Sequence, residues 1–545
     1  MRLFLALVLG LIALGAGTGG HGVDAGETLY NGIVLPDEWP PRAEKLSHEP
    51  MPTPWLTAPP KVIPIDVGRQ LFVDDFLVES TTLKRSFHLA KYHPKSPVLR
   101  PDKPWESVRQ SGGHPAPTAM VFSDGVFYDP HDRLFKMWYM GGYVAGTCYA
   151  TSRDGITWEK PALDFKPGTN VVQEGWRDSA TVWLDLEAKD PKRRFKLFVV
   201  QGNPEGKGWV CNVHESADGV HWGKPVVHTP PVGDRTTVFY NPFRKVWVYS
   251  LRIGYTGMGR SRRYREHADA VAGARWKREE AVLWVGADRG DPPREDLKIT
   301  PQLYNLDAVA YESLMLGLFS IWPGQPRDRA KPNYVALGFS RDGFHWHRPD
   351  HRPFIGVSEN YGDWNWGNVQ SAGGGCLVVG DTLYFYVSAR AGVKGSGASG
   401  VCSTGLATLR RDGFASMDAA DAEGSLTTRP VRFGGRHLFV NAAVQGELRV
   451  EVLDADGRLL PPFSRENCEP FRADTTLGAV RWKGAGDLAA VAGKPVRFRF
   501  HLRKGRLYAF WVSPDALGAS SGYVAAGGPG FTGPVDTVGR AAYPK

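Results

Sequence analysis

Cysteine is scarce in this chain: there are five cysteines among 545 residues, and the odd number argues against a framework in which every one is paired. Cys148, Cys211 and Cys402 each lie in a predicted strand shortly before a recurring turn. A small buried hydrophobic side chain fits such positions, so we expect core thiols. No cysteine or histidine cluster has the spacing of a zinc site, and we expect no metal and no cofactor.

Long apolar runs are equally scarce. After the first 16 residues, no segment approaches the ~20 apolar residues that a membrane-spanning helix needs. Met1 and Arg2 precede the apolar run from Leu3 to Ala16, and small residues lead to a cleavage site at Val23-Asp24-Ala25. This pattern predicts a secretory signal peptide over residues 1–25, with a membrane anchor as the alternative. We therefore expect a secreted or periplasmic protein without a membrane span.

The charge balance is basic, with a formal net charge of +9 and 23% charged residues. Such a balance fits an anionic partner such as an acidic polysaccharide, and a basic surface without a partner is the alternative. The chain contains no recognised nucleic-acid-binding module, so we expect no nucleic-acid partner.

Glycine, proline and aromatic residues are abundant, with 64 Gly, 41 Pro and 12% aromatic residues. This composition favours short strands and turns over helices, and the length favours two folded domains. The predicted fold class is therefore all-β.

A short turn recurs along the chain. Three copies are nearly identical: Ser152-Arg-Asp-Gly-Ile-Thr-Trp158, Ser216-Ala-Asp-Gly-Val-His-Trp222 and Ser340-Arg-Asp-Gly-Phe-His-Trp346. Two eroded copies lie at residues 267–276 and 411–414. The copies are separated by roughly 55 to 70 residues, which fits four strands per repeat. We predict a five-bladed β-propeller.

Each turn follows a hairpin whose second strand is aromatic, as in Leu134-Phe-Lys-Met-Trp-Tyr139 and Leu383-Tyr-Phe-Tyr386. After residue 425 the turn no longer recurs, and alternating strands such as Glu447-Leu-Arg-Val-Glu-Val-Leu453 indicate a β-sandwich. The predicted organisation is a Pro-rich arm over 26–64, a five-bladed β-propeller over 65–422, and a β-sandwich with a Gly-rich tail over 423–545.

The Asp and Gly of the repeated turn have a structural explanation, because Asp bonds its own backbone and Gly accepts a positive φ. A feature present in nearly every blade cannot mark a unique site. We therefore expect these Asp residues to be scaffold, and the Trp to fill space between blades.

The repeated turn and the segment Trp176-Arg-Asp-Ser-Ala-Thr-Val-Trp183 together resemble the five-bladed propeller glycosidases of glycoside hydrolase families 32 and 43. The second segment is similar to the Arg-Asp-Pro motif that opens the second blade in family 32. By that resemblance, Asp178 stabilises the charge that develops on the sugar. The resemblance implies an exported glycosidase acting on an oligo- or polysaccharide, with the propeller over about residues 65–420 and a β-sandwich after it.

The chain departs from that pattern in two blades. The first-blade segment Ser111-Gly-Gly-His-Pro-Ala-Pro-Thr118 has no carboxylate where the relatives have an Asp, and the third blade offers Asp234 where they have a Glu. Two alternatives to a glycosidase follow: a carbohydrate-binding propeller without catalysis, or a lyase or phosphorylase acting on an anionic sugar.

Three Asp residues share one strand face at the start of their blades. Asp178 and Asp234 lie seven residues before their hairpin positions, and Asp307 lies five before its own, so the parity is equal. We predict that these three carboxylates meet at the central pocket and form the catalytic set, because glycoside hydrolysis needs a general acid and a base or nucleophile. Turn capping or pairing with adjacent Arg residues is the alternative.

Asp74 and Asp75 precede the first blade. They either supply the missing carboxylate or lie on a strand that closes the last blade. The loop of the third blade from 257 to 265 is densely cationic, and Arg forks bind carboxylate or sulfate, with ion pairing between blades as the alternative. Trp side chains before the fifth blade offer stacking platforms for sugars, or core packing. The predicted substrate-binding residues are His114, Arg177, Arg260, Arg262, Tyr264, Trp364, Trp366 and Asn368.

Overall fold

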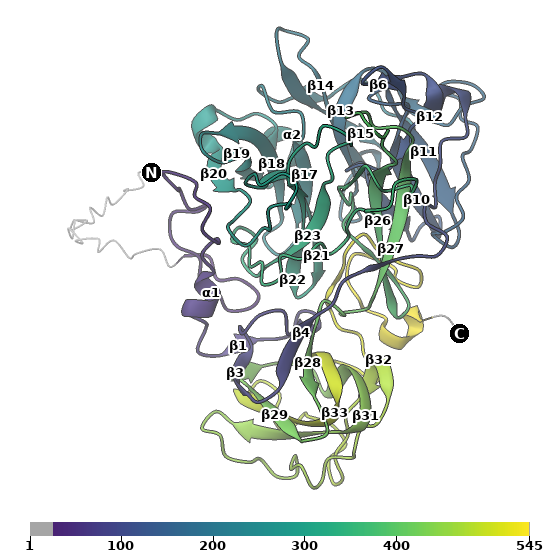
Figure 1. The fold of residues 1–545 in the computed structure, drawn as a ribbon. Coiled ribbons are helices and arrows are strands. Elements are labelled where there is room, and N and C mark those ends of the chain that lie inside the picture. Colours follow the sequence, from purple (N-terminus) through teal and green to yellow (C-terminus); the bar gives the residue numbers. More distant parts are fainter. Residues whose placement is uncertain (1–25, 544–545) are drawn as a thin grey trace, which may run out of the picture.

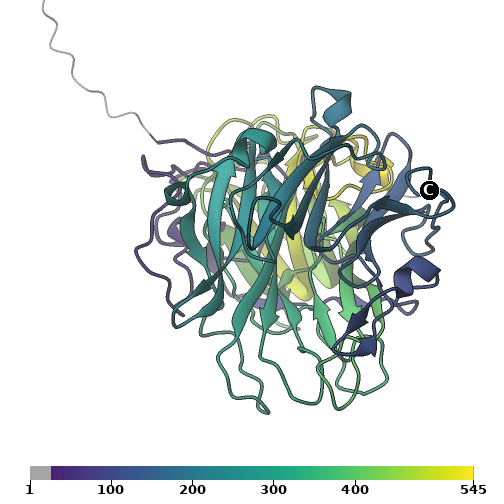
Figure 2. The same ribbon diagram turned by 90° about the horizontal axis from the view of Figure 1, so that it is seen from above.

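The computed structural model describes residues 26–543, so the predicted signal peptide lies outside the described residues. The chain forms two lobes (Figure 1), and a view turned by 90° shows the sheets of the larger lobe side by side (Figure 2). No helix in the described part of the chain is long and apolar enough to cross a membrane.

The larger lobe is a propeller of five sheets, as predicted. Blade one contains β8 (Ala119–Met120), β9 (Val126–Asp129), β10 (Leu134–Gly141), β11 (Gly146–Ser152) and β12 (Val171–Gln173). Blade two contains β13 (Arg177–Leu184), β14 (Phe195–Gly202), β15 (Trp209–Ser216) and β16 (Val227–His228). Blade three contains β17 (Thr237–Asn241), β18 (Val246–Tyr255), β19 (Gly259–His267) and β20 (Val282–Val285).

Blades four and five recruit strands from the two ends of the chain. Blade four contains β21 (Gln302–Glu312), β22 (Leu314–Trp322) and β23 (Tyr334–Ser340), with β34 (Tyr523–Val524) pairing with β21. Blade five contains β24 (Asn368–Gln370), β25 (Leu377–Val379), β26 (Thr382–Arg390) and β27 (Cys402–Arg410). Its outer strand is β5 (Lys91–Tyr92), which closes the ring.

The aromatic strands predicted from the sequence are β10, β14, β18, β22 and β26, and their side chains form one continuous core between the blades. Cys148, Cys211 and Cys402 are buried in the propeller as free thiols, which confirms the prediction for them.

Short helical turns connect the strands. They are α1 (Pro54–Thr57), η1 (Pro104–Ser107), η2 (Pro191–Arg193), α2 (Ala270–Gly273), η3 (Arg278–Glu280) and η4 (Gly539–Ala542), and a hairpin of β6 (Gln110–Ser111) and β7 (His114–Pro115) precedes blade one. In the eroded third copy of the repeated turn, α2 replaces the Asp-Gly turn, and Asp269 caps this helix by accepting a hydrogen bond from Ala272 N.

The repeated turn has the structural role expected from its sequence. In the first copy, the Asp154 carboxylate accepts hydrogen bonds from Ile156 N (2.8 Å) and Thr157 N (2.7 Å), and Gly155 has φ of +72°. Tyr386 of blade five donates its hydroxyl hydrogen to Gly155 O at 2.6 Å. In the same way, Trp138 of blade one donates to Gly219 O of the next turn. The turns therefore join neighbouring blades.

The smaller lobe is a ten-stranded sheet around a second hydrophobic core. It combines N-terminal and C-terminal strands, which appear together in purple and green to yellow in the lower part of Figure 1. The strands are β1 (Ile63–Pro64), β2 (Gln70–Leu71), β3 (Val78–Thr81), β4 (Lys84–Phe87), β28 (Ala415–Ala419), β29 (Gly424–Thr428), β30 (Val431–Arg432), β31 (His437–Asp454), β32 (Asp474–Ala479) and β33 (Val496–Ser513). Two 18-residue strands, β31 and β33, form its centre.

This sheet corrects the predicted boundary at residue 65, because β2, β3 and β4 belong to the smaller lobe and the propeller begins at β5. It also corrects both alternatives for Asp74. That carboxylate is buried and forms a bidentate ion pair with Arg341 of the fourth repeated turn, with both distances 2.8 Å.

A buried ion-pair network joins the two lobes. Arg69 Nη1 lies 2.9 Å from Asp412 Oδ2 and donates to Thr476 O at 2.7 Å. Arg411 and Arg69 also share the Glu312 carboxylate. The eroded fifth copy of the turn, residues 411–414, has thus become part of the contact between the lobes.

The Gly-rich tail packs against the propeller. Tyr128 N of blade one donates to Ala526 O at 2.9 Å, and Val378 N of blade five donates to Gly527 O at 2.9 Å. Together with the pairing of β34 and β21, these bonds cross three blades. The tail therefore belongs to the propeller end that faces away from the predicted site.

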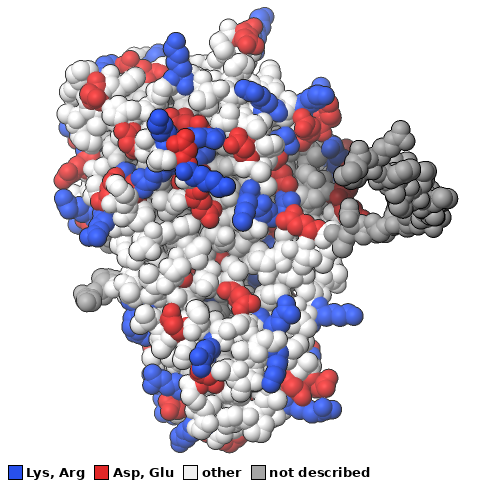
Figure 3. All heavy atoms as spheres, turned by 180° about the vertical axis from the view of Figure 1, so that it is seen from behind, with Lys and Arg blue, Asp and Glu red and all other residues white. Residues whose placement is uncertain are grey.

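Charged side chains of both signs are interspersed over both lobes on the face shown in Figure 3. The net charge of +9 is therefore not gathered into a single basic patch on that face.

The contact between Tyr386 and the first turn can be tested by replacing Gly155 with Ala. The left-handed conformation costs an Ala residue about 1–2 kcal/mol. A Cβ atom at this position would lie 2.7 Å from the Tyr386 hydroxyl. We expect Gly155→Ala to lower the free energy of unfolding by about 2–4 kcal/mol in denaturant titrations.

Gly168→Ala is the matched control, because Gly168 has φ of +78° and no atom lies within 4 Å of the position of its Cβ. This variant should lower the free energy of unfolding only by the cost of the left-handed backbone conformation, about 1–2 kcal/mol. Equal losses in the two variants would contradict a specific contact between the blades.

Candidate active site

Each blade contributes one polar residue to a buried group around the propeller axis, which we name the central cluster. Its members are Ser123, Asp178, Arg235, Asp307 and Ser371, from blades one to five in that order. Asp178 lies near the start of β13, Arg235 just before β17, and Asp307 within β21. The cluster therefore lies near the N-terminal ends of the inner strands β13 and β17.

Arg235 connects the members of the central cluster. Its Nη2 donates to Ser371 Oγ at 2.7 Å and to Ser123 Oγ at 3.2 Å, and its Nη1 lies 3.7 Å from Asp178 Oδ1. The guanidinium also stacks on Phe122, with Cζ 3.7 Å from the ring centroid. Arg235 is fully buried, so its charge acts on its neighbours with little screening by solvent.

Asp307 lies deepest among the three predicted catalytic residues. Its Oδ2 accepts hydrogen bonds from Asn305 Nδ2 (2.9 Å), Ala372 N (3.1 Å) and Ser123 Oγ (3.2 Å). Burial raises the pKa of its carboxyl, although the charge of Arg235 opposes the shift. With these partners, Asp307 positions Ser123 and Asn305.

Asp178 lies at the accessible side of the central cluster. Its side chain is 21% exposed, yet Oδ1 is buried and has no hydrogen-bond partner among the described residues. Burial raises the pKa of this carboxyl; Arg235 opposes the shift and nearby Asp234 adds to it. A raised pKa is what a general acid needs, because the group then keeps its proton at a higher pH.

Asp234 is more exposed, at 39% of its side chain, and its Oδ1 lies 3.4 Å from Arg252 Nε. Its backbone is fixed next to the second blade, because Ser179 Oγ donates to Asp234 O at 2.9 Å. The structure places Asp178 and Asp234 near each other, one beside Arg235 and the other beside Arg252, and we name the surface around this pair the mouth. Asp234 lies in the turn before β17, so strand parity does not account for its position, and Asp307 is more deeply buried than either.

Arg177 was predicted to bind substrate, and the structure places it elsewhere. It is fully buried and forms a bidentate ion pair with Asp124, with Nη1 2.9 Å from Oδ1. Asp124 is a first-blade carboxylate that the sequence analysis missed, since it follows β8 instead of preceding it. Its pairing with Arg177 joins blades one and two and leaves neither group exposed to a ligand.

Arg262 and Tyr264 also lie away from the mouth, which corrects their predicted role. Arg262 is fully buried and donates to Tyr304 O, Ser250 O and Asn305 Oδ1, and burial lowers its pKa to about 9. Tyr264 packs between Trp284 and Phe344 in the interblade core.

The predicted residues before the fifth blade are mostly structural. Trp366 is buried under the Arg329 guanidinium, whose Cζ lies 4.7 Å from the ring centroid. Trp364 packs edge-on against Tyr92 of the outer strand. Asn368 is fully buried and donates to Lys331 O at 2.7 Å. None of the three is placed as a platform for sugar.

Arg260 is half-buried between groups of the third and fourth blades. It donates to Gln302 Oε1 at 3.2 Å, and its Cζ lies 5.4 Å from the Tyr304 ring and 5.0 Å from the Trp322 ring. Lys331 reaches the same tyrosine, with Nζ donating to Tyr304 Oη at 3.0 Å. A substrate-binding role for Arg260 is consistent with this location.

His114 is exposed in the short hairpin of β6 and β7. The hairpin contacts the loop after β26, because Ser111 Oγ and Ser399 Oγ form a hydrogen bond of 3.1 Å. Arg390 Nη1 and the Tyr143 hydroxyl also contact Ser399 Oγ, at 3.3 and 3.2 Å. The His114 assignment thus stays a prediction.

Trp176 is an aromatic group that the sequence analysis did not assign. It directly precedes Arg177 and Asp178, is 49% exposed, and stacks on Trp209 with ring centroids 4.2 Å apart and an interplanar angle of 21°. A rigid exposed indole at this position is the kind of surface on which a sugar ring stacks. Its place within the motif that contains Asp178 was the available signal.

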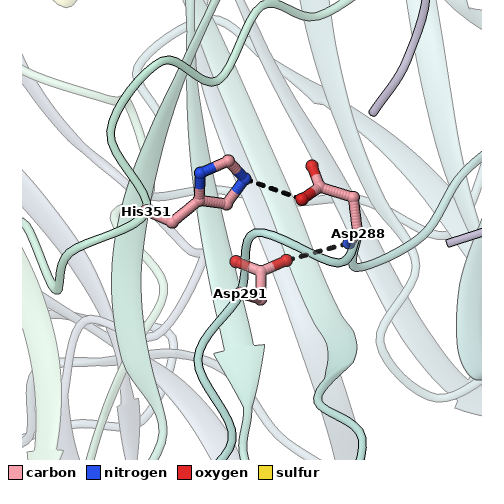
Figure 4. Close-up of side chains that lie close together, drawn as sticks. All are labelled: Asp288, Asp291 and His351. Carbon is pink, nitrogen blue, oxygen red and sulfur yellow. Dashed lines mark hydrogen bonds and ion pairs between the residues drawn. The ribbon is translucent and has the colours of Figure 1, made fainter. Parts of the chain in front are cut away.

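One group of side chains has the composition of a metal site. Asp288, Asp291 and His351 offer ligand atoms that all lie within 4.8 Å of one another (Figure 4). Arg348 already binds this group, with Nη1 2.7 Å from Asp291 Oδ2 and 3.3 Å from Asp288 Oδ2. Because a guanidinium neutralises these carboxylates, the group fits a structural ion pair better than a cation site.

No family model matches the chain, and no curated protein matches it. The solved structures that resemble it include a thermostable family-43 glycoside hydrolase (11% identity, TM-score 0.39, covering 55% of this chain and 93% of that one). Another is an endo-arabinase from Bacteroides thetaiotaomicron (11% identity, TM-score 0.35, covering 53% and 94%). Family 43 is one of the two families that the sequence resembles. At these TM-scores, the activity of this chain has to be argued from its own residues.

The central position of Arg235 predicts a large cost for its removal. Arg235→Met leaves two buried carboxyl groups, Asp178 and Asp307, without their cation, and we expect a loss of about 3–5 kcal/mol in the free energy of unfolding. Thermal or denaturant unfolding at neutral pH measures this loss.

Arg252→Met is the matched control, since Arg252 is 28% exposed and pairs with an exposed carboxylate. The expected loss is about 0–1 kcal/mol. If Arg235→Met were as mild as this control, the central cluster would not depend on its guanidinium.

Proposed function

We propose that the chain is an exported glycoside hydrolase that cleaves a glycosidic bond at the mouth of the propeller. The observation that carries this proposal is the pairing of two partly exposed carboxyl groups, Asp178 and Asp234, in different electrostatic surroundings. Glycoside hydrolysis needs two such carboxyls, one that donates a proton and one that acts in its ionised form. The N-terminal signal-peptide pattern supports export.

Asp178 is the general acid in this proposal. Burial raises the pKa of its carboxyl, which favours the protonated form, and in this proposal the proton passes to the glycosidic oxygen as the bond to the sugar breaks. Arg235, 3.7 Å away, then stabilises the carboxylate that remains. Since Oδ1 is buried beside Arg235, the proton is assigned in this proposal to the other carboxyl oxygen, Oδ2.

Asp234 is the base or nucleophile. In this proposal its carboxylate, 3.4 Å from Arg252 Nε, either removes a proton from the attacking water or attacks the sugar itself. Asp307 is a positioning residue, because it is buried and acts through Ser123 and Asn305.

Trp176 provides a surface for the sugar ring next to this pair. The stacked pair of Trp176 and Trp209 presents one exposed indole two residues before Asp178. An exposed, rigid aromatic face binds sugars at a low entropic cost. This proposal replaces the buried tryptophans of the fifth blade as the stacking platform.

A carbohydrate-binding propeller without catalysis is the second candidate. It is favoured by the state of Asp124, because this first-blade carboxylate is locked in a buried ion pair with Arg177. Under this alternative, the carboxyl pair would bind sugar hydroxyls, and no glycoside would be hydrolysed.

The acid role of Asp178 can be tested with substrates that differ in their leaving group. Asp178→Asn should lower kcat about 10²- to 10⁴-fold on oligosaccharides and much less on nitrophenyl glycosides, because nitrophenolate leaves without protonation. Asp234→Asn should lower both rates. In the unmodified protein, kcat/KM should fall as the pH rises through the raised pKa of Asp178.

Asp164→Asn serves as the control, since Asp164 is an exposed carboxylate that pairs with His221. Its activity should equal that of the unmodified protein. Full oligosaccharide hydrolysis by Asp178→Asn would contradict the assignment. Sugar binding without turnover of any glycoside would favour the binding propeller.

A further inference from the structure

Three cationic side chains beside the carboxyl pair have only neutral partners, and we name them the mouth cations: Arg260, Lys331 and Arg390. Arg260 donates to the Gln302 amide oxygen, Lys331 to the Tyr304 hydroxyl, and Arg390 to the Ser399 hydroxyl. Within residues 26–543, none of the three forms an ion pair with a carboxylate of the chain. Most other buried Arg residues in the described part of the chain form an ion pair with a carboxylate, as Arg69, Arg177 and Arg341 do, whereas the fully buried Arg262 has only neutral partners.

The mouth cations lie close to one another and to the proposed acid. Arg260 Cζ and Lys331 Nζ lie 5.4 and 5.0 Å from the centroid of the same ring, that of Tyr304. The charges of Lys331 and Arg390 both act on the Asp178 carboxyl and lower its pKa, against the larger effect of burial. Lys331 and Arg390 therefore lie near Asp178, and Arg260 shares the Tyr304 ring with Lys331.

Arg390 shows most clearly that a negative charge is missing. Arg390 is 7% exposed, and its Nε has no hydrogen-bond partner among the described residues. Its Cζ lies 5.6 Å from the ring centroid of Tyr143, and its charge lowers the pKa of that phenol. A buried charge without a counter-charge costs several kcal/mol, and a ligand that supplies the counter-charge removes that cost.

The excess of positive charge extends to the whole mouth. Arg235 lies beside Asp178 and Asp307, and Arg252 lies beside Asp234, so each of these carboxyl groups already has a cationic neighbour. The mouth cations come in addition to these pairs. A neutral sugar would leave their charges uncompensated, whereas an oxyanion on the sugar would pair with them through charge-assisted hydrogen bonds.

We propose that the mouth cations form a subsite for an oxyanion carried by the sugar, so that the substrate class is an acidic glycan. The oxyanion is a uronate carboxylate or a sulfate ester, since both present oxygen pairs to an Arg fork and to the Lys ammonium. This inference rests on the proposed function for its location beside the scissile bond. Binding of the oxyanion to this subsite does not require catalysis.

The test uses the full chain with Asp178→Asn, so that ligands bind without turnover. The probes are matched sets of methyl glycosides: glucuronate, galacturonate and mannuronate, the neutral parent of each, and the 6-sulfate of each parent. Isothermal titration at low salt measures each dissociation constant. We expect at least one acidic member to bind about tenfold or more tightly than its neutral parent, and the preference to weaken as salt is added.

Two further variants locate the preference. Lys331→Met, made in the same background, keeps the length of the partly exposed side chain and should reduce the acidic preference about three- to tenfold while leaving the neutral parent unchanged. Arg390→Gln should act in the same direction. Lys189→Met is the control, because Lys189 is an exposed lysine in the segment between β13 and β14 of the second blade. This variant should change neither the affinity for the acidic glycoside nor that for its neutral parent.

The outcomes separate this inference from the proposed function. Equal affinity for the acidic and neutral members, no binding of any acidic member, or an acidic preference that survives Lys331→Met would overturn the subsite. Hydrolysis of neutral glycosides with such a result would leave the proposed function intact. Selective binding of an acidic glycoside without hydrolysis by the unmodified protein would keep the subsite and overturn the hydrolase. The uronate and sulfate arms identify which oxyanion is bound.

Discussion

The geometry of the propeller axis depends on the buried guanidinium of Arg235. It comes from the third blade, donates to serines of the first and fifth blades, and lies beside carboxyls of the second and fourth. A buried charge tolerates little displacement from its partners, because each lost contact leaves an unscreened charge or an unsatisfied polar group. One side chain thereby fixes the relative positions of five blades and the environment of the proposed acid.

The repeated turns serve the structure in the outer part of the blades, and the central cluster serves the proposed function in the inner part. In the turns, the same residue types make the same contacts, such as the hydroxyl of Tyr386 and the indole of Trp138 bonding to glycine carbonyls of the next blade. At the axis, the blades carry three residue types, Ser, Asp and Arg, in place of one repeated residue. The repeated fold of the blades brings their inner strands to the axis, and the residues that differ between blades give the site at the axis its chemistry.

The repeat made the propeller and the carboxyl pair predictable from the sequence. Strand parity assigned Asp178, Asp234 and Asp307 to one face, and the structure places all three near Arg235. Parity gives the face of a strand and carries no information on depth. Residues 257–265 were expected to form a loop, but most of them belong to strand β19, and Arg262 is buried. The ion pair of Arg177 with Asp124 and the pair of Arg341 with Asp74 join distant segments, and no local pattern reports such partners.

The central claim is that burial raises the pKa of Asp178 although the cationic Arg235 lies beside it. Carbon-13 NMR of the protein labelled at the aspartate carboxyl groups, with the Asp178 signal assigned by its loss in Asp178→Asn, follows this group through a pH titration. The account predicts that Asp178 titrates above the ordinary range for Asp, as burial requires. Titration within or below that range would show that the carboxyl is ionised at neutral pH and is not the acid.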